Sequence, residues 1–230
     1  MNTADVLKEA LAALRAGGVI LYPTDTVWGL GCDATRPEAV ARVYEIKRRS
    51  EAKSLVLLAA DLDMVARYVK AVPNIAIDLV EVNDRPMTLI YPGAICGKAP
   101  AGSEQSGAGI GEPERPLSGK APLKPAPASL SPASKYQLAW NTVASDGSVG
   151  IRIPLPGFWR DLVARLGRPL VSTSANISGE PTPRRFAEIP EEIRAAVDYA
   201  VPASLERGST GAASQIIKVG LGGEVEIIRA

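Results

Sequence analysis

Short apolar runs alternate along the chain with longer segments whose apolar residues recur at helical spacing. The helical periodicity predicts helices over residues 3–15, 36–49, 61–69, 73–82 and 156–167. The apolar runs predict strands over residues 19–22, 54–60, 85–93, 147–154 and 168–179, the last of which runs into a polar loop. Residues 213–230 predict a terminal hairpin around Gly-Leu-Gly-Gly. Alternating strands and helices indicate an α/β fold, and the hairpin indicates a mixed rather than a parallel sheet.

Capping residues set the expected ends of the first two helices. Thr3 is the expected N-cap of the first helix, and the glycines at 17 and 18 are its expected stop. Thr35 comes just before the second helix, and Pro37 suits its first turn.

The segment from about residue 94 to residue 136 departs from this pattern. It is rich in Gly, Pro, Ser and Ala and has almost no aromatic or β-branched residues. Such a composition buries too little apolar surface to offset the entropy of ordering, which predicts a flexible, low-complexity insertion in a single domain spanning 1–230. The insertion is either a tolerated surface loop or a mobile lid over a site, and the sequence leaves both open.

Composition limits the kinds of chemistry and the location. The chain has 26 Lys+Arg against 25 Asp+Glu, so net charge alone indicates no partner, and local clusters of basic residues must do so. It has no histidine, which removes the usual general base, the Ser-His and Cys-His pairs and histidine metal ligands. Two cysteines without a pairing motif, no signal peptide and no membrane-spanning run predict a soluble cytoplasmic protein.

Three polar stretches are candidates for a binding site. Thr24, Asp25 and Thr26 follow an apolar strand, where two hydroxyls one residue apart either grip a small polar substrate or only cap a strand-to-helix connection. The run "KRRSEAK" is dense enough in cations for a polyphosphate or an RNA backbone, although a solvated helix end is the alternative. The run "VSTSANISG" is typical of a binding loop, yet neither GxxxxGK[ST] nor GxGxxG is present. The run "GSTGAAS" is a weaker loop of the same kind, and the three tryptophans are expected to pack in the core or at its rim.

Taken in order, these motifs resemble one family. "GGVILYPTDTVWGLG", "KRRSEAKSL", "RPMTLIYPG", "VGIRIP", "RPLVSTSANISG" and "AASQIIKV…IIRA" are similar to the YrdC-type threonylcarbamoyl-AMP synthases, in their single-domain form. The resemblance covers nearly the whole chain outside the insertion. It implies a twisted mixed β-sheet flanked by helices around a large concave basic cavity.

The resemblance also implies an activity and its partners. The expected enzyme is a nucleotidyltransferase that joins L-threonine, bicarbonate or CO2 and ATP into threonylcarbamoyl-AMP with release of pyrophosphate. Mg2+ is expected to accompany the ATP, with no metal ligand supplied by protein side chains. The expected partners are tRNA and the proteins that transfer the threonylcarbamoyl group to the adenosine next to the anticodon.

Site residues follow from the resemblance, position by position. Lys47 and Arg49 of the Lys-x-Arg motif are the expected catalytic residues. The expected threonine-binding residues are Thr24, Thr26, Ser174 and Ser214. The expected ATP-binding residues are Lys47, Arg49, Lys53, Thr88, Arg152, Asn176 and Arg229.

The chain departs from the family pattern at Ser54, Leu58 and Gln215, which affects the amino-acid pocket more than the nucleotide end. The expected chemistry is compatible with the residues present. When a carbamate oxygen attacks the α-phosphorus, charge grows on phosphate, and fixed cations rather than histidine are the main requirement. Two alternatives remain. One is a non-catalytic double-stranded RNA or tRNA binder, and the other is a carbamoyl-transfer domain like that of hydrogenase maturation, against which the lack of paired cysteine motifs argues.

Overall fold

The computed structural model describes residues 2–50, 55–99, 136–206 and 208–230. In these residues nine strands form one sheet in the order β7-β1-β2-β6-β3-β5-β4-β8-β9. The strands are β1 Ile20–Pro23, β2 Trp28–Gly31, β3 Val56–Leu58, β4 Met87–Tyr91, β5 Val149–Arg152, β6 Leu170–Ser174, β7 Tyr199–Ala200, β8 Gln215–Val219 and β9 Val225–Arg229. The pairs β1–β7, β3–β5 and β4–β8 are parallel, and the other neighbouring pairs are antiparallel. The predicted mixed sheet is confirmed.

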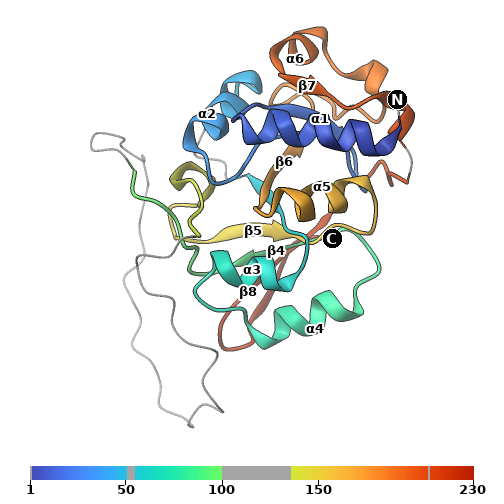
Figure 1. Cartoon of the computed structure of the whole chain (residues 1–230). Helices are drawn as coiled ribbons and strands as arrows, with labels where there is room; N and C mark the ends of the chain where they lie inside the picture. The colour runs from blue at the N-terminus through green and yellow to red at the C-terminus, as the bar shows by residue number, and fades with distance from the viewer. Residues whose placement is uncertain (1, 51–54, 100–135, 207) are drawn as a thin grey trace.

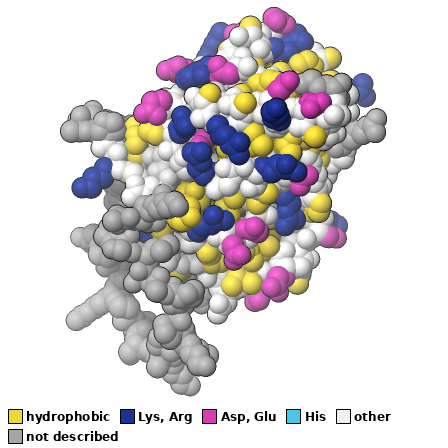
Figure 2. All heavy atoms as spheres, in the orientation of Figure 1, with side chains coloured by type: hydrophobic (Ala, Val, Ile, Leu, Met, Phe, Trp, Pro, Cys, Tyr) yellow, Lys and Arg dark blue, Asp and Glu magenta, His cyan; other side chains and the backbone are white. Residues whose placement is uncertain are grey.

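Helices cover one face of this sheet. Figure 1 shows α1, α5, α3 and α4 following one another down the side that faces the viewer, with α2 and α6 toward the upper end. The α-helices are α1 Thr3–Arg15, α2 Pro37–Ile46, α3 Leu62–Tyr68, α4 Asn74–Val82, α5 Phe158–Leu166 and α6 Glu191–Ala196. Single 3₁₀ turns are η1 Trp140–Thr142, η2 Phe186–Glu188 and η3 Ala203–Leu205. On this covered face, lysine and arginine side chains are interspersed with acidic and apolar ones (Figure 2), as the balanced composition leads one to expect.

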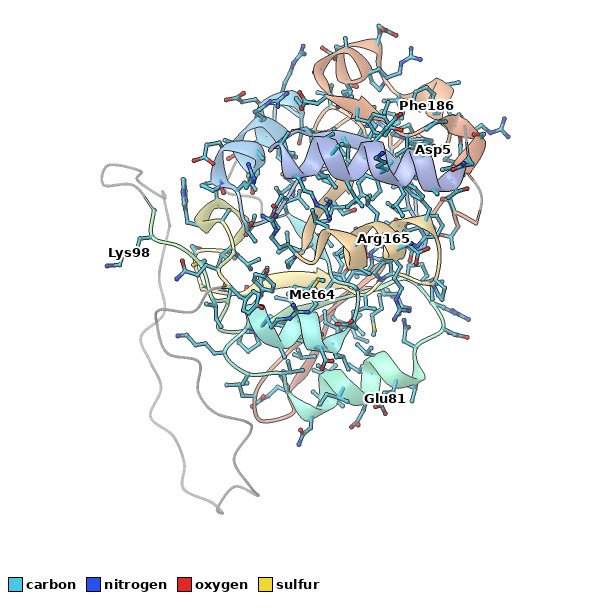
Figure 3. The ribbon with its side chains drawn as sticks, in the orientation of Figure 1. Asp5, Met64, Glu81, Lys98, Arg165 and Phe186 are labelled. Atoms are coloured by element: carbon cyan, nitrogen blue, oxygen red, sulfur yellow. The ribbon has the colours of Figure 1, made fainter. Side chains whose placement is uncertain are left out.

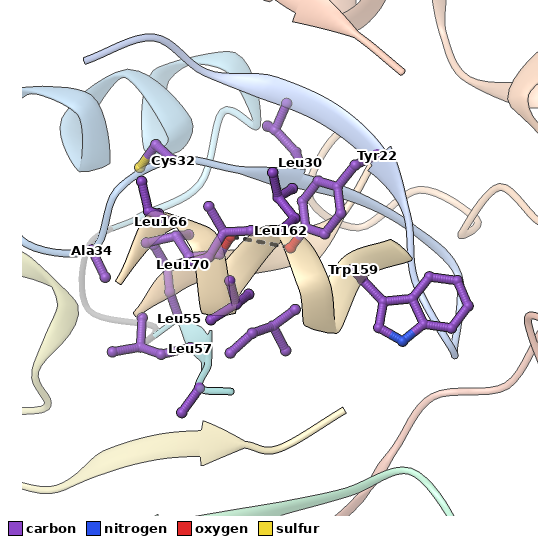
Figure 4. Packing of buried hydrophobic residues seen from close by; sticks show 14 of the residues in the cluster. Tyr22, Leu30, Cys32, Ala34, Leu55, Leu57, Trp159, Leu162, Leu166 and Leu170 are labelled. Carbon is purple, nitrogen blue, oxygen red and sulfur yellow. Dashed lines mark hydrogen bonds between the residues drawn. The ribbon is translucent and has the colours of Figure 1, made fainter. Parts of the chain in front are cut away.

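The core lies between the helices and the sheet. In Figure 4, Leu162 and Leu166 of α5 pack with Leu57 of β3 and Leu170 of β6, and all of these side chains are buried. Burying apolar surface at about 25 cal/mol per Å² is the main stabilising contribution to such a layer. Trp28 and Trp159 are 1% and 4% exposed, so these two tryptophans are packing residues, as predicted.

The alternation of side chains along β4 and β5 separates two faces with different chemistry. Met87, Leu89 and Tyr91 alternate with Thr88 on β4, and Ile151 alternates with Arg152 on β5. Because successive strand residues point to opposite faces, the apolar set faces the helices while Thr88 and Arg152 face the other side. The polar face therefore carries the side chains available for a site.

The stretch after the first strand differs from the expected loop. Trp28–Gly31 forms β2, which returns antiparallel beside β1 and pairs on its other side with β6. Gly29 and Gly31 lie two residues apart and so face the same way. A Cβ at Gly31 would lie 2.2 Å from the backbone oxygen of Val171, so only glycine permits this approach of β2 to β6. The interpretation of this segment as a plain strand-to-helix connection is wrong.

Other boundaries also differ from the sequence prediction. Asn2, not Thr3, caps α1, because its side-chain oxygen accepts from the amide of Asp5 at 2.9 Å. Helix α2 ends at Ile46 rather than continuing to residue 49, whereas Gly17 has the positive φ of a helix stop, as predicted. The short α6 and β7 were not predicted, since six and two residues are too few to carry a periodic pattern.

The two ends of the predicted insertion contact the body of the protein. Ala94 forms a bridge with Val69, and Cys96 forms one with Leu138. Residues 100–135 lie outside the described residues, so the choice between lid and tolerated loop stays a prediction. Among the helices in the described ranges, none has the length and apolar character needed to cross a bilayer.

Candidate functional site

A cavity of about 370 Å³ opens on the polar face of the sheet, where the β1–β2 turn meets β5, β6, β8 and β9. Among the described residues, its charged lining side chains are all arginines and its other polar side chains all carry hydroxyls. It brings together these predicted site residues: Thr24, Thr26, Arg49, Arg152, Ser174, Ser214 and Arg229. An electropositive cavity edged with hydroxyl groups suits an anionic ligand such as a polyphosphate.

The two threonine hydroxyls of the β1–β2 turn form different hydrogen bonds. Thr24 Oγ1 donates to the Val27 oxygen at 2.7 Å and accepts from the amides of Thr26 and Val27 at 3.1 and 3.2 Å. The hydroxyls of Thr24 and Thr26 are 2.8 Å apart, and since the Thr24 proton is already donated, Thr26 is the donor of that bond. Thr24 Oγ1 is therefore occupied by bonds within the turn, and its expected contact with threonine stays a prediction. Thr26 Oγ1 accepts from Arg152 Nη2 and keeps a second lone pair that can accept from a ligand.

Asp25 and Arg152 form a buried ion pair beneath this turn. The two residues are 1% and 4% exposed, and Arg152 Nη1 donates to Asp25 Oδ1. Asp25 Oδ2 accepts from the Leu155 amide at 3.1 Å, and Arg152 Nη2 lies 3.4 Å from Thr26 Oγ1. A buried guanidinium held on one side by a carboxylate is fixed in position, so Arg152 offers a preorganised positive charge to the cavity.

Lys47 holds the loop after β6 instead of lining the cavity. Its side chain is buried, and its Nζ donates to the backbone oxygens of Ser174 and Asn176 and to Asn176 Oδ1, the last two at 2.7 and 3.3 Å. An ammonium has three protons, and these three acceptors use all of them. Burial, with a smaller effect of Arg49, lowers the pKa of Lys47 to about 8. Lys47 thus binds the loop after β6 in this structure, and its expected roles in catalysis and ATP binding stay predictions.

Asn176 is likewise committed to the loop. Its Oδ1 also accepts from the hydroxyl of Ser174, and its Nδ2 donates to the Glu180 oxygen at 2.6 Å. Ser174 lines the cavity, whereas Asn176 does not. The Ser-x-Asn motif thus orients the polar loop through internal hydrogen bonds, and ATP binding by Asn176 stays a prediction.

The end of α2 explains how Lys47 and Arg49 come to point differently. The amide of Arg48 donates to the Glu45 oxygen and that of Arg49 to the Tyr44 oxygen, both at 2.9 Å, which is a Schellman ending. Arg48 has φ of 49°, the left-handed conformation that glycine usually supplies there. The chain reverses at this residue, so Lys47 turns inward while Arg49 lines the cavity. Burial lowers the pKa of Arg49, and the group stays charged at neutral pH.

The far wall of the cavity is built by the terminal hairpin. The hydroxyls of Thr88 and Ser214 are 2.8 Å apart, and Arg229 donates from Nε and Nη2 to the Ser214 oxygen at 3.0 and 2.6 Å. Thr88 is 1% exposed and lies behind Ser214, so it supports the wall rather than lining it. Lys53 is a predicted ATP ligand that lies outside the described residues.

The described part of the chain contains no group of three His, Cys, Asp or Glu side chains placed to hold a metal ion. Asp25, a carboxylate beneath the β1–β2 turn, is already paired with Arg152. These described residues do not fit a metal held by protein side chains.

Thr182 lines the cavity and was missed by the sequence prediction. Ser172 and Thr173 also line it; they belong to the run "VSTSANISG", which was identified as a binding loop without a role for these two residues. Asp25 was noted in its motif without a role, and only the folded chain shows it beside Arg152, far away in sequence.

Comparisons with known proteins show the family to which the chain belongs. The sequence profile of the Sua5/YciO/YrdC family, described as telomere recombination, matches residues 12–120 and 110–230. The threonylcarbamoyl-AMP synthase of Stenotrophomonas maltophilia (strain K279a) is 32% identical over 209 residues, which cover 91% of this chain and 89% of that protein.

Two solved structures share the fold. E. coli YciO has a TM-score of 0.65 at 19% identity, with 99% of this chain and 89% of that chain covered. P. abyssi Sua5 complexed with L-threonine has a TM-score of 0.66 at 21% identity, with 95% of this chain and 52% of that chain covered. At these identities the structures show the fold alone, while the sequence matches show the kinship. The chain belongs to the Sua5/YciO/YrdC family.

Proposed function

We propose that this protein is a threonylcarbamoyl-AMP synthase, which joins L-threonine, bicarbonate or CO2 and ATP into the adenylate and releases pyrophosphate. The observation that carries the proposal is the placement of Arg49, Arg152 and Arg229 around one hydroxyl-lined cavity. The S. maltophilia relative bears the name of this enzyme, and the Sua5 structure of the same fold was determined with L-threonine.

The reaction needs the amine of threonine to capture CO2 as a carbamate. A carbamate oxygen then attacks the α-phosphorus of ATP, the bond to the bridging oxygen of pyrophosphate breaks, and that oxygen takes up the electron pair. Negative charge grows on the phosphates during this step, so preorganised cations stabilise the transition state more than the ground state. Arg49 and Arg229 are the cations that we assign to phosphate, and Arg152 is assigned to the carbamate and carboxylate end because it adjoins Thr26.

The hydroxyl groups are assigned to the amino acid. Thr26 Oγ1 accepts from the ligand because its own proton is donated to Thr24. Ser174 and Ser214 line the same cavity and supply further hydroxyls. Fixed cations together with hydroxyl groups make this a site for positioning rather than for proton transfer.

Magnesium enters with the substrate. We infer that Mg2+ travels on the ATP phosphates, since the described lining of the cavity offers arginines and hydroxyls and not carboxylates. We further assign the product to the threonylcarbamoyl modification of the adenosine next to the tRNA anticodon. Transfer proteins complete this step, and a cytoplasmic location is expected for it.

The test is a reaction of the purified protein with L-threonine, bicarbonate and Mg-ATP, in which pyrophosphate is assayed and the adenylate is identified by its mass. Omission of threonine or of bicarbonate should abolish both signals. Pyrophosphate release that is independent of threonine contradicts the proposal. Tight, ATP-independent binding of double-stranded RNA without adenylate formation would instead identify the non-catalytic RNA binder.

A further inference from the structure

A second cavity, of about 210 Å³, lies on the opposite face of β4 and β5 from the substrate cavity. Strand side chains form its floor, and Val80 of α4 lines its side. In Figure 3 Glu81 of α4 points away from the protein, so the other side of that helix faces the sheet. Its apolar walls include Val80, Met87, Leu89 and Ile151, and its polar edge includes Tyr91 and Arg160. Apolar walls with a few polar groups are typical of small-molecule sites.

Tyr91 brings a hydrogen-bond donor to this cavity. The residue is 1% exposed and lines the cavity. Burial raises the pKa of Tyr91 above its ordinary value, so the hydroxyl keeps its proton at neutral pH. A protonated hydroxyl at the cavity wall can donate to a ligand atom that accepts a hydrogen bond.

Arg160 brings a positive charge that the described residues do not neutralise. Its Nε donates to the Ala60 oxygen at 3.0 Å, which fixes the guanidinium in place. In the described ranges no carboxylate lies within ion-pair distance of Arg160. A fixed guanidinium beside apolar walls favours an anion with an apolar body, and its fork matches a carboxylate.

We propose that this cavity is a second ligand site, which binds a small carboxylate with a branched or aromatic apolar body. The carboxylate faces Arg160, the apolar body lies against the side chains of β4, β5 and α4, and the Tyr91 hydroxyl donates to an acceptor atom of the ligand. No residue of the substrate cavity is shared with this site.

One short segment lies between the two cavities and has contacts on both sides. Ile153–Pro156 lines the second cavity, while the Leu155 amide within it donates to Asp25 Oδ2, whose partner is Arg152 of the substrate cavity. Prolines at 154 and 156 restrict the backbone of this segment, so a ligand that displaces the Leu155 side chain also displaces the Leu155 amide. Occupation of the second cavity therefore changes the affinity for threonine, and threonine changes the affinity for the carboxylate by the same factor. This coupling, unlike the binding itself, rests on the proposed function.

Phenylacetate is a suitable probe, with 4-methylpentanoate as a branched one, phenylacetamide as the neutral counterpart and acetate as the counterpart without an apolar body. Binding is measured by calorimetry or by ligand-observed NMR without ATP or threonine. We expect both apolar carboxylates to bind at least about tenfold more tightly than phenylacetamide and acetate. Absence of binding by both, or equal binding of phenylacetate and phenylacetamide, overturns the proposal.

Matched variants locate the binding. Val80→Trp fills the cavity, whereas Val82→Trp places the same side chain at a position that is 80% exposed on the same helix. Binding should be lost in the first and kept in the second; loss in neither overturns the site. Where Val80→Trp fails to fold, Tyr91→Phe and the pair Arg160→Gln and Arg160→Lys serve instead. Tyr91→Phe and Arg160→Gln should weaken phenylacetate severalfold, and Arg160→Lys should retain most of the preference over phenylacetamide.

The coupling is measured as the threonine dissociation constant with and without saturating phenylacetate. A change of at least about threefold is expected in the parent protein and none in Val80→Trp. An unchanged constant in the parent protein overturns the coupling. If threonine does not bind at all, the proposed function fails while the phenylacetate measurements still judge the second site.

Discussion

The ammonium of Lys47 binds Asn176 twice, through the backbone oxygen at 2.7 Å and through Oδ1 at 3.3 Å. Its third proton goes to the backbone oxygen of Ser174. One lysine at the end of α2 thereby fixes the polar loop after β6, which lines the cavity next to Arg49. The two cations of the Lys-x-Arg motif thus lie differently: Lys47 binds the loop after β6, and Arg49 lines the cavity.

The two cations should respond differently to removal. Lys47→Met leaves buried acceptors unpaired, so the free energy of unfolding should fall by about 2–3 kcal/mol. Arg49→Ala should leave the fold intact. Its kcat/KM for ATP should fall by an amount that corresponds to a loss of about 2–4 kcal/mol of transition-state stabilisation. Urea unfolding and pyrophosphate release separate the two effects. Unchanged pyrophosphate release by folded Arg49→Ala protein would refute the assignment of Arg49 to phosphate.

The lowered pKa of Lys47 predicts a pH dependence of stability. The folded-state pKa of about 8 lies below the ordinary 10.5, so the folded chain releases a proton that the unfolded chain keeps. The cost of burying the charge is constant below pH 8 and is relieved as the pH rises from 8 toward 10.5. The unfolding free energy of the parent protein, relative to that of Lys47→Met, should therefore rise over this window by up to about 1.4 kcal/mol per pH unit. A flat difference between pH 7 and pH 10 in urea titrations would show that Lys47 stays charged.

The buried pair of Asp25 and Arg152 should behave as one unit. Asp25→Asn leaves a buried guanidinium without its countercharge, and the expected loss of unfolding free energy is about 3–5 kcal/mol. The double variant Asp25→Asn/Arg152→Met should recover part of that loss, because no unpaired charge remains. Threonine binding should be absent from both. A double-mutant cycle by chemical denaturation gives the coupling energy, and additive effects of the two changes would count against the pair.

The hydroxyl of Thr26 predicts substrate selectivity. A site that hydrogen-bonds a hydroxyl-bearing substrate disfavours an analogue without it, because its own polar groups stay unpaired. Threonine should therefore exceed valine in kcat/KM by roughly a hundredfold or more, with serine as the nearest competitor. Thr26→Val should weaken threonine use, whereas Thr26→Ser retains the hydroxyl and serves as the matched control. Equal turnover of valine and threonine by the parent protein would show that the pocket is misplaced.

The predicted insertion provides a deletion test. The Gly97 amide donates to the Leu138 oxygen at 2.9 Å, so the two described ends adjoin and a short Gly-Ser linker can join them. Replacement of residues 100–135 should leave the melting temperature nearly unchanged. Unchanged ATP turnover would identify a tolerated loop, and reduced turnover by a folded protein would identify a lid. Unfolding on deletion would contradict both interpretations.

Helices and strands with long periodic patterns were predictable from the sequence. Short elements whose formation depends on distant contacts were not. Apolar periodicity was enough for α1 and α5, and for the mixed character of the sheet. Strand β2 was missed because its glycines lower strand propensity, although two glycines on one face of a strand do indicate a close backbone approach.

The site shows the same division. The order of the motifs identified many of the residues that gather at the cavity. The spacing of residues along the chain does not show which hydroxyl and ammonium groups already form hydrogen bonds within the protein. The internal bonds of Thr24 and Lys47 join groups up to 129 residues apart, and only the folded chain shows them.

The cavity draws its walls from both ends of the chain, with consequences for the order of folding. The amides of Thr210 and Gly211 donate to the backbone oxygens of Asp25 and Thr26 at 2.9 and 2.8 Å, and Arg229 closes the wall from the last strand. A chain emerging from the ribosome holds the first wall long before the last one exists, and such distant pairing is slow to form. A ligand of this cavity therefore stabilises only molecules in which β9 has docked. Partly folded molecules gain no stability from the substrate and stay open to proteolysis.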